Sequence, residues 1–375
     1  MSSNKINKLV SDINKKFTPE GAEKSVIQTG DNLTEVEYIP ACSYALGYAM
    51  GQGGWPVGKL IELFGPEGAG KTTLLLMGLR DIYEAYEGER VVALIDIEHR
   101  FNPDWATKLG LEVDENLIVA QPPTAEAATD IMIHLIKSGE VAAIGFDSIG
   151  GVAPEKEATT FEDQNTMYGG AAKVMSRNVR VVGSLANLYN VTCIYVNHVR
   201  ADMSGYNRII TPGGHAVKHH MSQRLYIRRG KDRYTEKTGE GEVQVGFPMV
   251  FKNYKNSFGI PFREQWSDFY FIENKTTGGI GFDINKELQR LAIAMGIVER
   301  KGPWFFYDEV KAHGRENFFA ELEAEGLLDD LKQDVMQRFA TDATNSDEAE
   351  EKLADDPELA KPATDTSLDD ILNLS

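Results

Sequence analysis

Cysteine is scarce in this chain of 375 residues, which contains only Cys42 and Cys193. Two cysteines in apolar surroundings are too few for a disulfide framework and should be inert core thiols, and no Cys/His cluster has the spacing of a zinc site. Long apolar runs are missing as well: no stretch approaches the roughly 20 residues of a transmembrane helix, and no apolar signal region follows Met1. We therefore expect a cytoplasmic protein with no membrane partner.

The chain has fewer basic than acidic residues, and its net charge is −18. Residues 341–375 carry half of the imbalance, because they hold eleven acidic residues against two lysines. This composition predicts a disordered acidic tail. By contrast, residues 218–233 carry six cations against one aspartate. This local basic stripe either contacts nucleic acid or is an ordinary basic surface.

A complete phosphate-binding loop stands at residues 65–72, which read Gly-Pro-Glu-Gly-Ala-Gly-Lys-Thr. An apolar run at 59–64 predicts a buried strand before it, and residues 72–79 predict a helix after it. The loop glycines let backbone N–H groups converge on an anion at the positive end of that helix. Lys71 should reach the β- and γ-phosphates, and the Thr72 hydroxyl should ligate Mg²⁺. The predicted nucleotide contacts of the loop are Gly65, Pro66, Glu67, Gly68, Ala69, Gly70, Lys71, Thr72 and Thr73.

Two further apolar runs end in carboxylates, where ligands bind in open α/β sheets. Asp147 ends the first run and is expected to hold the metal through water, with a structural cap as the alternative. Glu98 follows the second run and is a candidate general base. The alternative there is that Asp96 and Glu98 are both loop acids or caps.

The pattern along the chain predicts an α/β protein with a mostly parallel sheet. Residues 4–17 have the apolar spacing of an amphipathic helix, and two polar, Gly-bearing loops at 158–170 and 201–214 are long enough to suggest a function. The expected parts are an N-terminal docking helix with its linker (1–36), an ATPase core (37–276), a small C-terminal α/β domain (277–340) and the tail (341–375).

Several motifs together resemble one family, the RecA recombinases. They are 65–73, Ile95-Asp96-Ile97-Glu98-His99, Phe146-Asp147-Ser148, Val196-Asn197-His198-Val199-Arg200, Pro212-Gly213-Gly214 and 254–262, in this order and at closely similar separations. The resemblance runs from the N-terminal helix to the acidic tail. It implies a RecA-type P-loop core and a DNA-dependent ATPase that forms a helical filament on single-stranded DNA. Such a filament pairs with homologous double-stranded DNA and exchanges strands in DNA repair and the SOS response, assisted by a single-strand binding protein or a loader.

The same resemblance implies roles for individual residues. Lys71, Thr72 and Thr73 would bind ATP and Mg²⁺, Glu98 would activate water, and Asp147 would support the metal. Trp105 would stack on adenine, beside Asn102 where the family often has Asp, and Lys255 would reach the ATP of the neighbouring subunit. The residues implied at the primary DNA site are Met167, Lys173, Arg177, Arg180, Arg200, Tyr206, Gly213 and Gly214, and Arg228 and Arg229 match a basic pair of the duplex-binding site.

Departures from the family pattern concern how the γ-phosphate is sensed. His198 stands where the family usually has Gln; it can still donate a hydrogen bond, but the charge of an imidazole depends on pH. Ser257 stands where a second lysine is usual. Two alternatives share the core: a ring-forming ATPase or helicase acting on DNA, and a regulatory paralogue that no longer hydrolyses ATP. The intact Lys71, Glu98 and Asp147 argue against the second.

Overall fold

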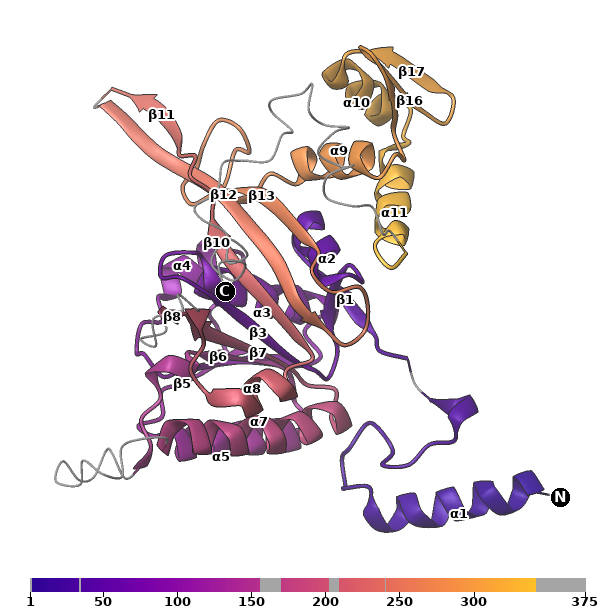
Figure 1. Cartoon of the computed structure of the whole chain (residues 1–375), viewed down its shortest axis with the longest axis vertical. Coiled ribbons are helices and arrows are strands. Elements are labelled where there is room, and N and C mark those ends of the chain that lie inside the picture. The colour runs from indigo at the N-terminus through magenta and orange to yellow at the C-terminus, as the bar shows by residue number, and fades with distance from the viewer. Residues whose placement is uncertain (1, 34, 156–169, 202–208, 240, 342–375) are drawn as a thin grey trace. The chain divides into compact units, whose positions relative to one another are not determined.

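A computed structural model describes residues 2–33, 35–155, 170–201, 209–239 and 241–341 of the chain (Figure 1). Internal contacts divide the chain into two compact units. Among the described residues, unit 1 comprises 2–39 and 55–224, and unit 2 comprises 40–54 and 225–341. Apart from Thr341, the predicted acidic tail lies outside the described residues.

Five parallel strands form the sheet of unit 1, in the order β3-β7-β6-β4-β5. They are β3 (Leu60–Gly65), β4 (Val91–Asp96), β5 (Leu117–Ala120), β6 (Val141–Asp147) and β7 (Thr192–His198). All but β5 are buried along almost their whole length, as is usual when helices cover both faces of a parallel sheet. The predicted mostly parallel α/β core is confirmed.

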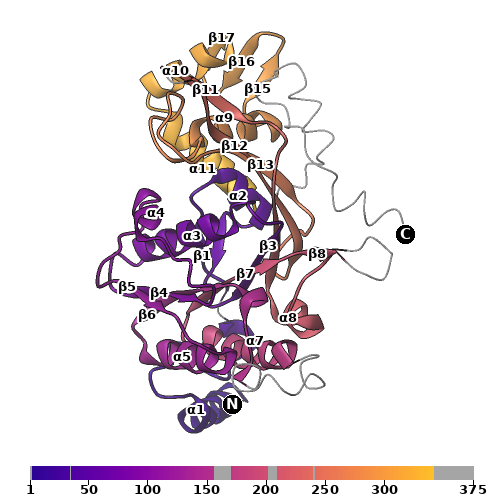
Figure 2. The same cartoon turned by 90° about the vertical axis from the view of Figure 1, so that its left-hand side faces the viewer.

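Helices cover both faces of this sheet. They are α3 (Lys71–Ala85), α4 (Pro103–Lys108), α5 (Ala125–Ser138), α7 (Gly170–Leu188) and α8 (Gly214–His220). Figure 2 shows α3 on one face and α5 and α7 on the other. On α7, Met175, Val179, Val182 and Ala186 recur at helical spacing, and they pack into one core with Phe146 of β6. Short elements complete unit 1: η1 (Gly30–Asn32), η2 (Ile149–Gly151), and the antiparallel pair β8 (Arg200–Ala201) and β9 (Ile209–Ile210).

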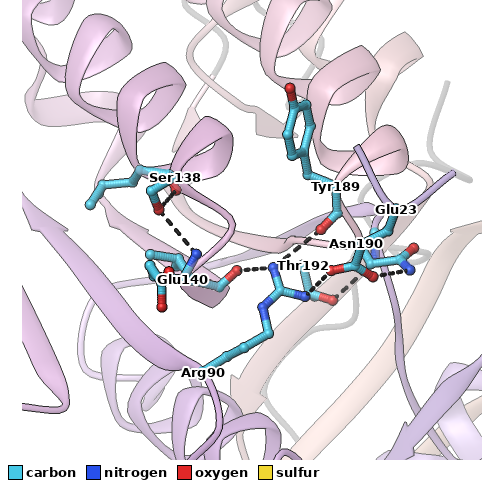
Figure 3. A network of polar contacts seen from close by, with 10 residues as sticks. Glu23, Arg90, Ser138, Glu140, Tyr189, Asn190 and Thr192 are labelled. Carbon is cyan, nitrogen blue, oxygen red and sulfur yellow. Dashed lines mark hydrogen bonds and ion pairs between the residues drawn. The ribbon is translucent and has the colours of Figure 1, made fainter. Parts of the chain in front are cut away.

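The predicted amphipathic N-terminal helix is confirmed as α1 (Ser2–Phe17). Arg90, which is 8% exposed, fastens the segment after this helix to the rest of unit 1. Its guanidinium donates to Glu23 Oε1 at 2.7 Å and to the carbonyls of Val141 and Tyr189 (Figure 3). The other Glu23 oxygen accepts a hydrogen bond from Asn190 Nδ2 at 2.6 Å. A buried arginine therefore fixes the point from which α1 extends.

Unit 2 contributes strands in the order β14-β13-β12-β10, with β11 paired to β12, and the β11–β12, β12–β13 and β13–β14 pairs are antiparallel. The strands are β10 (Gln223–Arg229, whose first two residues belong to unit 1), β11 (Tyr234–Thr238), β12 (Gly241–Asn256), β13 (Glu264–Tyr270) and β14 (Gly281–Phe282). Helix α2 (Tyr44–Met50) packs on β12 and β13. The chain enters and leaves this helix through β1 (Tyr38–Pro40) and β2 (Gly54–Pro56), which pair with each other.

A small α/β layer follows in unit 2. It contains α9 (Ile284–Ala294), the antiparallel strands β15 (Glu299–Lys301), β16 (Trp304–Tyr307) and β17 (Val310–His313), and the helices α10 (Arg315–Ala324) and α11 (Leu328–Arg338). Its core includes Leu291, Phe305, Phe318 and Phe339. The mixed content is that expected for this region, whereas the boundaries at 36, 276 and 340 stay predictions. In the described part of the chain, no helix is long and apolar enough to cross a membrane.

Candidate nucleotide site and DNA-facing residues

The phosphate-binding loop has the predicted context, because β3 ends at Gly65 and α3 begins at Lys71. Gly70 has φ 91°, a left-handed conformation that favours glycine, so the chain can turn directly into the helix. The Lys71 side chain is nearly buried, and Nζ donates to the Pro66 carbonyl at 2.7 Å. Burial lowers the pKa of Lys71, while the nearby charges of Asp147, Glu67 and Glu98 raise it. The loop thus holds an amine beside the N–H groups at the start of α3, which have no partner within the helix.

A hydroxyl and a carboxylate meet at the mouth of the loop. Thr72 Oγ1 donates to Asp147 Oδ2 at 2.6 Å. Burial raises the pKa of Asp147, against the effect of this hydrogen bond. The two oxygen ligands suit Mg²⁺, which is commonly held by one or two protein oxygens together with substrate phosphates. The described residues contain no group of three His, Cys, Asp or Glu side chains that could enclose a metal by themselves.

Glu98 lies beyond the end of β4 and is surrounded by donors. Its Oε1 accepts from the Ser148 hydroxyl and lies 3.2 Å from His198 Nε2, and its Oε2 lies 3.1 Å from Arg100. Burial would raise the pKa of Glu98, but Ser148, His198 and Arg100 together outweigh it, so the pKa lies below its ordinary value. The carboxylate is therefore charged at neutral pH, as a base that orients water must be.

Asp96 has the structural role that the sequence left open for it. Its carboxylate accepts from the backbone N–H groups of Arg100 and Phe101, each at 3.1 Å, and from Gln121 Nε2 at 2.8 Å. It is 3% exposed. Asp96 therefore shapes the turn that carries Glu98, and the two carboxylates have different environments.

The two residues predicted at the adenine lie together in unit 1. Asn102 Oδ1 accepts from the Trp105 backbone N–H at 3.1 Å and so caps α4. Trp105 Nε1 donates to Thr73 Oγ1 at 3.3 Å, which places the indole beside the first turn of α3. Lys255 belongs to β12 in unit 2, so its approach to a neighbour's ATP remains a prediction.

Three of the predicted DNA contacts share one face of a helix. Lys173, Arg177 and Arg180 are exposed on α7 at positions i, i+4 and i+7. Arg200 is exposed at the start of β8. Gly213 and Gly214 lie at the start of α8. At Gly213, φ is 96° and an added Cβ would lie 2.7 Å from Val217 Cγ2, so a side chain would not fit.

The remaining DNA candidates differ in environment. Met167 and Tyr206 lie outside the described residues. Arg228 is 6% exposed and pairs with Glu264 at 3.1 Å, and the Arg229 guanidinium stacks over the Phe247 ring at 4.2 Å. These two arginines are thus held by contacts inside unit 2, and their duplex-binding role stays a prediction.

The sequence did not single out Ser148 or Asn197 as site residues. Ser148 binds Glu98, and Asn197 Oδ1 accepts from the His198 backbone N–H at 2.9 Å. Each directly adjoins a residue that was predicted, at the carboxyl end of a parallel strand. That position was the signal that could have found them.

Comparison with known proteins gives a consistent result. The family model described as RecA N-terminal domain matches residues 4–275. Protein RecA of Thermus aquaticus is 36% identical over 309 residues, which cover 81% of this chain and 86% of the relative. Protein RecA of Mycoplasma mobile is 32% identical over 345 residues (91% and 98%), and that of Acholeplasma laidlawii 33% over 344 residues (90% and 99%). The matched range 4–275 spans the positions of the phosphate loop, Glu98, Asp147 and His198.

Proposed function

Since the chain belongs to the RecA family of recombinases, which act in DNA recombination and repair, we propose that it hydrolyses ATP with Mg²⁺ in order to control a filament on single-stranded DNA. The family implies nucleotide binding, DNA-dependent ATPase activity, DNA binding and filament formation. The observation that carries the proposal is one arrangement in unit 1: Lys71, the Thr72–Asp147 pair and a charged Glu98 beside His198. A ring-forming ATPase or helicase is not favoured.

In this proposal each group has one task. Lys71 exchanges the Pro66 carbonyl for the β- and γ-phosphates, and the N–H groups at the start of α3 bind the remaining phosphate oxygens. Thr72 and Asp147 hold Mg²⁺, which when bound would neutralise charge that develops on the phosphates. Glu98 orients a water molecule toward the γ-phosphate and takes its proton. Trp105 and Asn102 flank the adenine.

His198 is proposed to sense the γ-phosphate. Its Nε2 lies beside Glu98 Oε1, and the chain continues from it into the second predicted DNA loop, 201–214. An imidazole N–H can donate to a phosphate oxygen as a glutamine amide can. We expect coupling between ATP and DNA to survive, and DNA-stimulated ATP turnover that His198→Ala leaves unchanged would contradict this role.

The proposed DNA contacts follow the described surface of unit 1. The exposed cations of α7 and Arg200 track the phosphate backbone, with Gly213 and Gly214 at the base of the second loop. Single-stranded DNA binds there, and duplex DNA binds at a second site with Arg228 and Arg229. A single-strand binding protein or a loader completes the proposed partners in the cytoplasm.

A second copy of the chain is the proposed partner of α1. The helix exposes Ile6, Leu9 and Phe17, which are 48%, 59% and 58% accessible. An amphipathic helix has to bury such a stripe to be stable in water. Docking on a neighbouring subunit would bury it and would leave ATP between subunits, within reach of the neighbour's Lys255.

Strand exchange between a single strand and a homologous duplex, with and without ATP, tests the function. Lys71→Ala should abolish exchange, because it removes the cation that holds the β- and γ-phosphates. Lys137→Ala is the matched control, since Lys137 is an exposed lysine at the end of α5. Exchange retained by Lys71→Ala would refute the site, and ATP-driven unwinding without exchange by the unaltered protein would favour a helicase.

A further inference from the structure

A buried polar network lies between the phosphate loop and the second predicted DNA loop. At its centre is Glu62 of β3, which is 0% exposed and precedes the phosphate loop by three residues. Its Oε1 accepts from Asn197 Nδ2 at 2.7 Å, and its Oε2 accepts from Arg224 Nε. Asn197 is also 0% exposed, and the Arg224 side chain is 14% exposed. A carboxylate without water is costly unless it is paired, so the three side chains depend on one another.

Asn197 connects the γ-phosphate sensor to the end of the second loop. Its Nδ2 donates to Glu62 and also to the Pro212 carbonyl at 3.0 Å, and its Oδ1 accepts from His198 N at 2.9 Å. Because an ionised carboxylate only accepts hydrogen bonds, Glu62 forces the NH₂ group of Asn197 toward itself. The amide oxygen must then face His198. Glu62 therefore decides which way the Asn197 amide points.

Arg224 holds the same stretch of chain from the other side. One guanidinium nitrogen donates to Thr211 Oγ1 at 3.3 Å while Nε binds Glu62, and the group lies 4.6 Å from the centre of the Phe64 ring. Thr211 is 8% exposed. A planar guanidinium can serve two acceptors in one fixed geometry, which a lysine cannot do. Arg224 thus links Thr211 to the buried carboxylate of Glu62, and Asn197 links Pro212 to the same carboxylate.

The strand register explains how this network could transmit a movement of His198 to Thr211 and Pro212. Phe64 pairs with Asn197 and Gly65 pairs with His198 in the β3–β7 ladder. The phosphate loop and the sensor therefore begin at the same level of the sheet, and Thr211–Pro212 is fixed to that level. Displacement of His198 by a γ-phosphate would strain hydrogen bonds that end on Pro212. A rigid, hydrogen-bonded network transmits such a shift better than a loose loop does.

We propose that Glu62, Asn197 and Arg224 are positioning residues that couple ATP binding to DNA binding by holding His198 and the Thr211–Pro212 end of the second loop in one arrangement. The inference rests on the proposed function, because it assumes that ATP and DNA bind at these two places. None of the three side chains has to touch ATP or DNA for this role.

Coupling is measured as the ratio of two dissociation constants for single-stranded oligothymidylate, without and with a non-hydrolysable ATP analogue. Asn197→Ala should lower this ratio about tenfold, as expected for the loss of hydrogen bonds near 1.4 kcal/mol in total. Affinity for the analogue without DNA, and for DNA without the analogue, should stay within about twofold of the unaltered protein. An unchanged ratio would overturn the proposal.

Paired variants separate positioning from a merely structural role. Arg224→Met leaves a buried charge unpaired and should lower both stability in urea and the coupling ratio. Adding Glu62→Met removes that charge and should restore stability while the ratio stays low, since Thr211 still lacks Arg224 and Asn197 now lacks Glu62. Recovery of both quantities in the double variant would overturn the proposal.

Asp81→Asn is the matched control. Asp81 is a buried carboxylate of α3 that pairs with Arg80 at 2.7 Å and accepts from Trp55 Nε1 at 3.0 Å. Its replacement should lower stability and leave the coupling ratio unchanged; a ratio that falls as far as in Asn197→Ala would count against a specific network. If the unaltered protein itself shows no effect of the analogue on DNA affinity, the proposed function fails, which is a different outcome from a variant that loses the effect.

Discussion

Glu287→Gln should change the way in which stability depends on pH. Glu287 lies in α9 and is 2% exposed. Its carboxylate accepts from Ser43 Oγ at 2.8 Å and from the Ala45 backbone N–H at 3.2 Å, and so caps α2. Burial is the largest influence and raises the pKa of Glu287 to about 7, although Ser267, Ser43, Ala45 and Arg290 act against it.

The sign follows from proton binding in the two states. With a pKa near 4.5 in the unfolded chain and about 7 in the folded one, the folded protein keeps a proton that the unfolded chain releases. Stability is therefore highest below the unfolded pKa and falls as pH rises through the folded pKa. Each pKa unit corresponds to 1.36 kcal/mol, so the free energy of unfolding should fall by about 3 kcal/mol between the unfolded and the folded pKa of Glu287.

Urea unfolding followed by tryptophan fluorescence measures the effect. A chain with net charge −18 approaches neutrality in acid and then associates, so measurements begin at about pH 6. Between pH 6 and about pH 8.5 the protein passes through roughly the last pH unit below the folded pKa of Glu287. The free energy of unfolding of the unaltered protein should therefore fall by about 1.4 kcal/mol over this range.

The free energy of unfolding of Glu287→Gln should not fall in this way between about pH 6 and pH 8.5, even if the substitution lowers stability by a constant amount. The matched control is Glu325→Gln, at the exposed C-terminal end of α10, which should behave like the unaltered protein. Parallel curves for Glu287→Gln and the unaltered protein over this pH range would refute the reasoning, because they would mean that Glu287 binds protons equally in both states.

The other predictions concern catalysis, folding and the tail. Glu98→Gln should lower ATP turnover by about 100-fold or more while ATP affinity persists, in steady-state and binding assays; turnover near that of the unaltered protein would exclude Glu98 as the base. Arg90→Met should cost on the order of 3 kcal/mol in urea unfolding because three acceptors lose their donor. Glu23→Gln should lower the free energy of unfolding by only about 1 kcal/mol, because the Glu23 side chain is 42% exposed. Equal losses of stability in Arg90→Met and Glu23→Gln would contradict this account. Removal of residues 341–375 should strengthen duplex binding and lower the Mg²⁺ required, since a tethered polyanion competes with DNA; unchanged salt and Mg²⁺ dependence would count against it.

Much of the fold was predictable because its signals are local. Buried parallel strands read as apolar runs, and the phosphate loop is a contiguous motif, so β3, the loop and α3 follow from a short stretch of sequence. The carboxyl ends of the strands also placed Glu98 and Asp147 at one edge of the sheet. The environments of Asp96 and Glu98 could not be told apart from spacing, since they depend on Gln121 and Ser148, which follow much later in the chain.

The basic stripe at 218–233 shows the limit of reasoning from charge. Arg224 lies in it, yet its partner is Glu62, 162 residues earlier in the chain. Arg228 is likewise paired, with Glu264. No local pattern reveals such pairs, because the two members meet only when the sheet has formed. A count of cations therefore does not show which of them form ion pairs inside the protein.

Burial divides the cations of this acidic chain into two groups. Arg90, Arg224, Arg228 and Arg290 are nearly buried and hold carboxylates, amide oxygens or backbone carbonyls of their own units. The cations at 173, 177 and 180 are exposed along one face of α7. Exposed cations that bind a polyanion release the counterions condensed on it, so the second group is the one that suits the primary DNA site. The negative net charge is thus no obstacle to DNA binding, because charge on an exposed helix face acts locally, within about 8 Å at physiological salt.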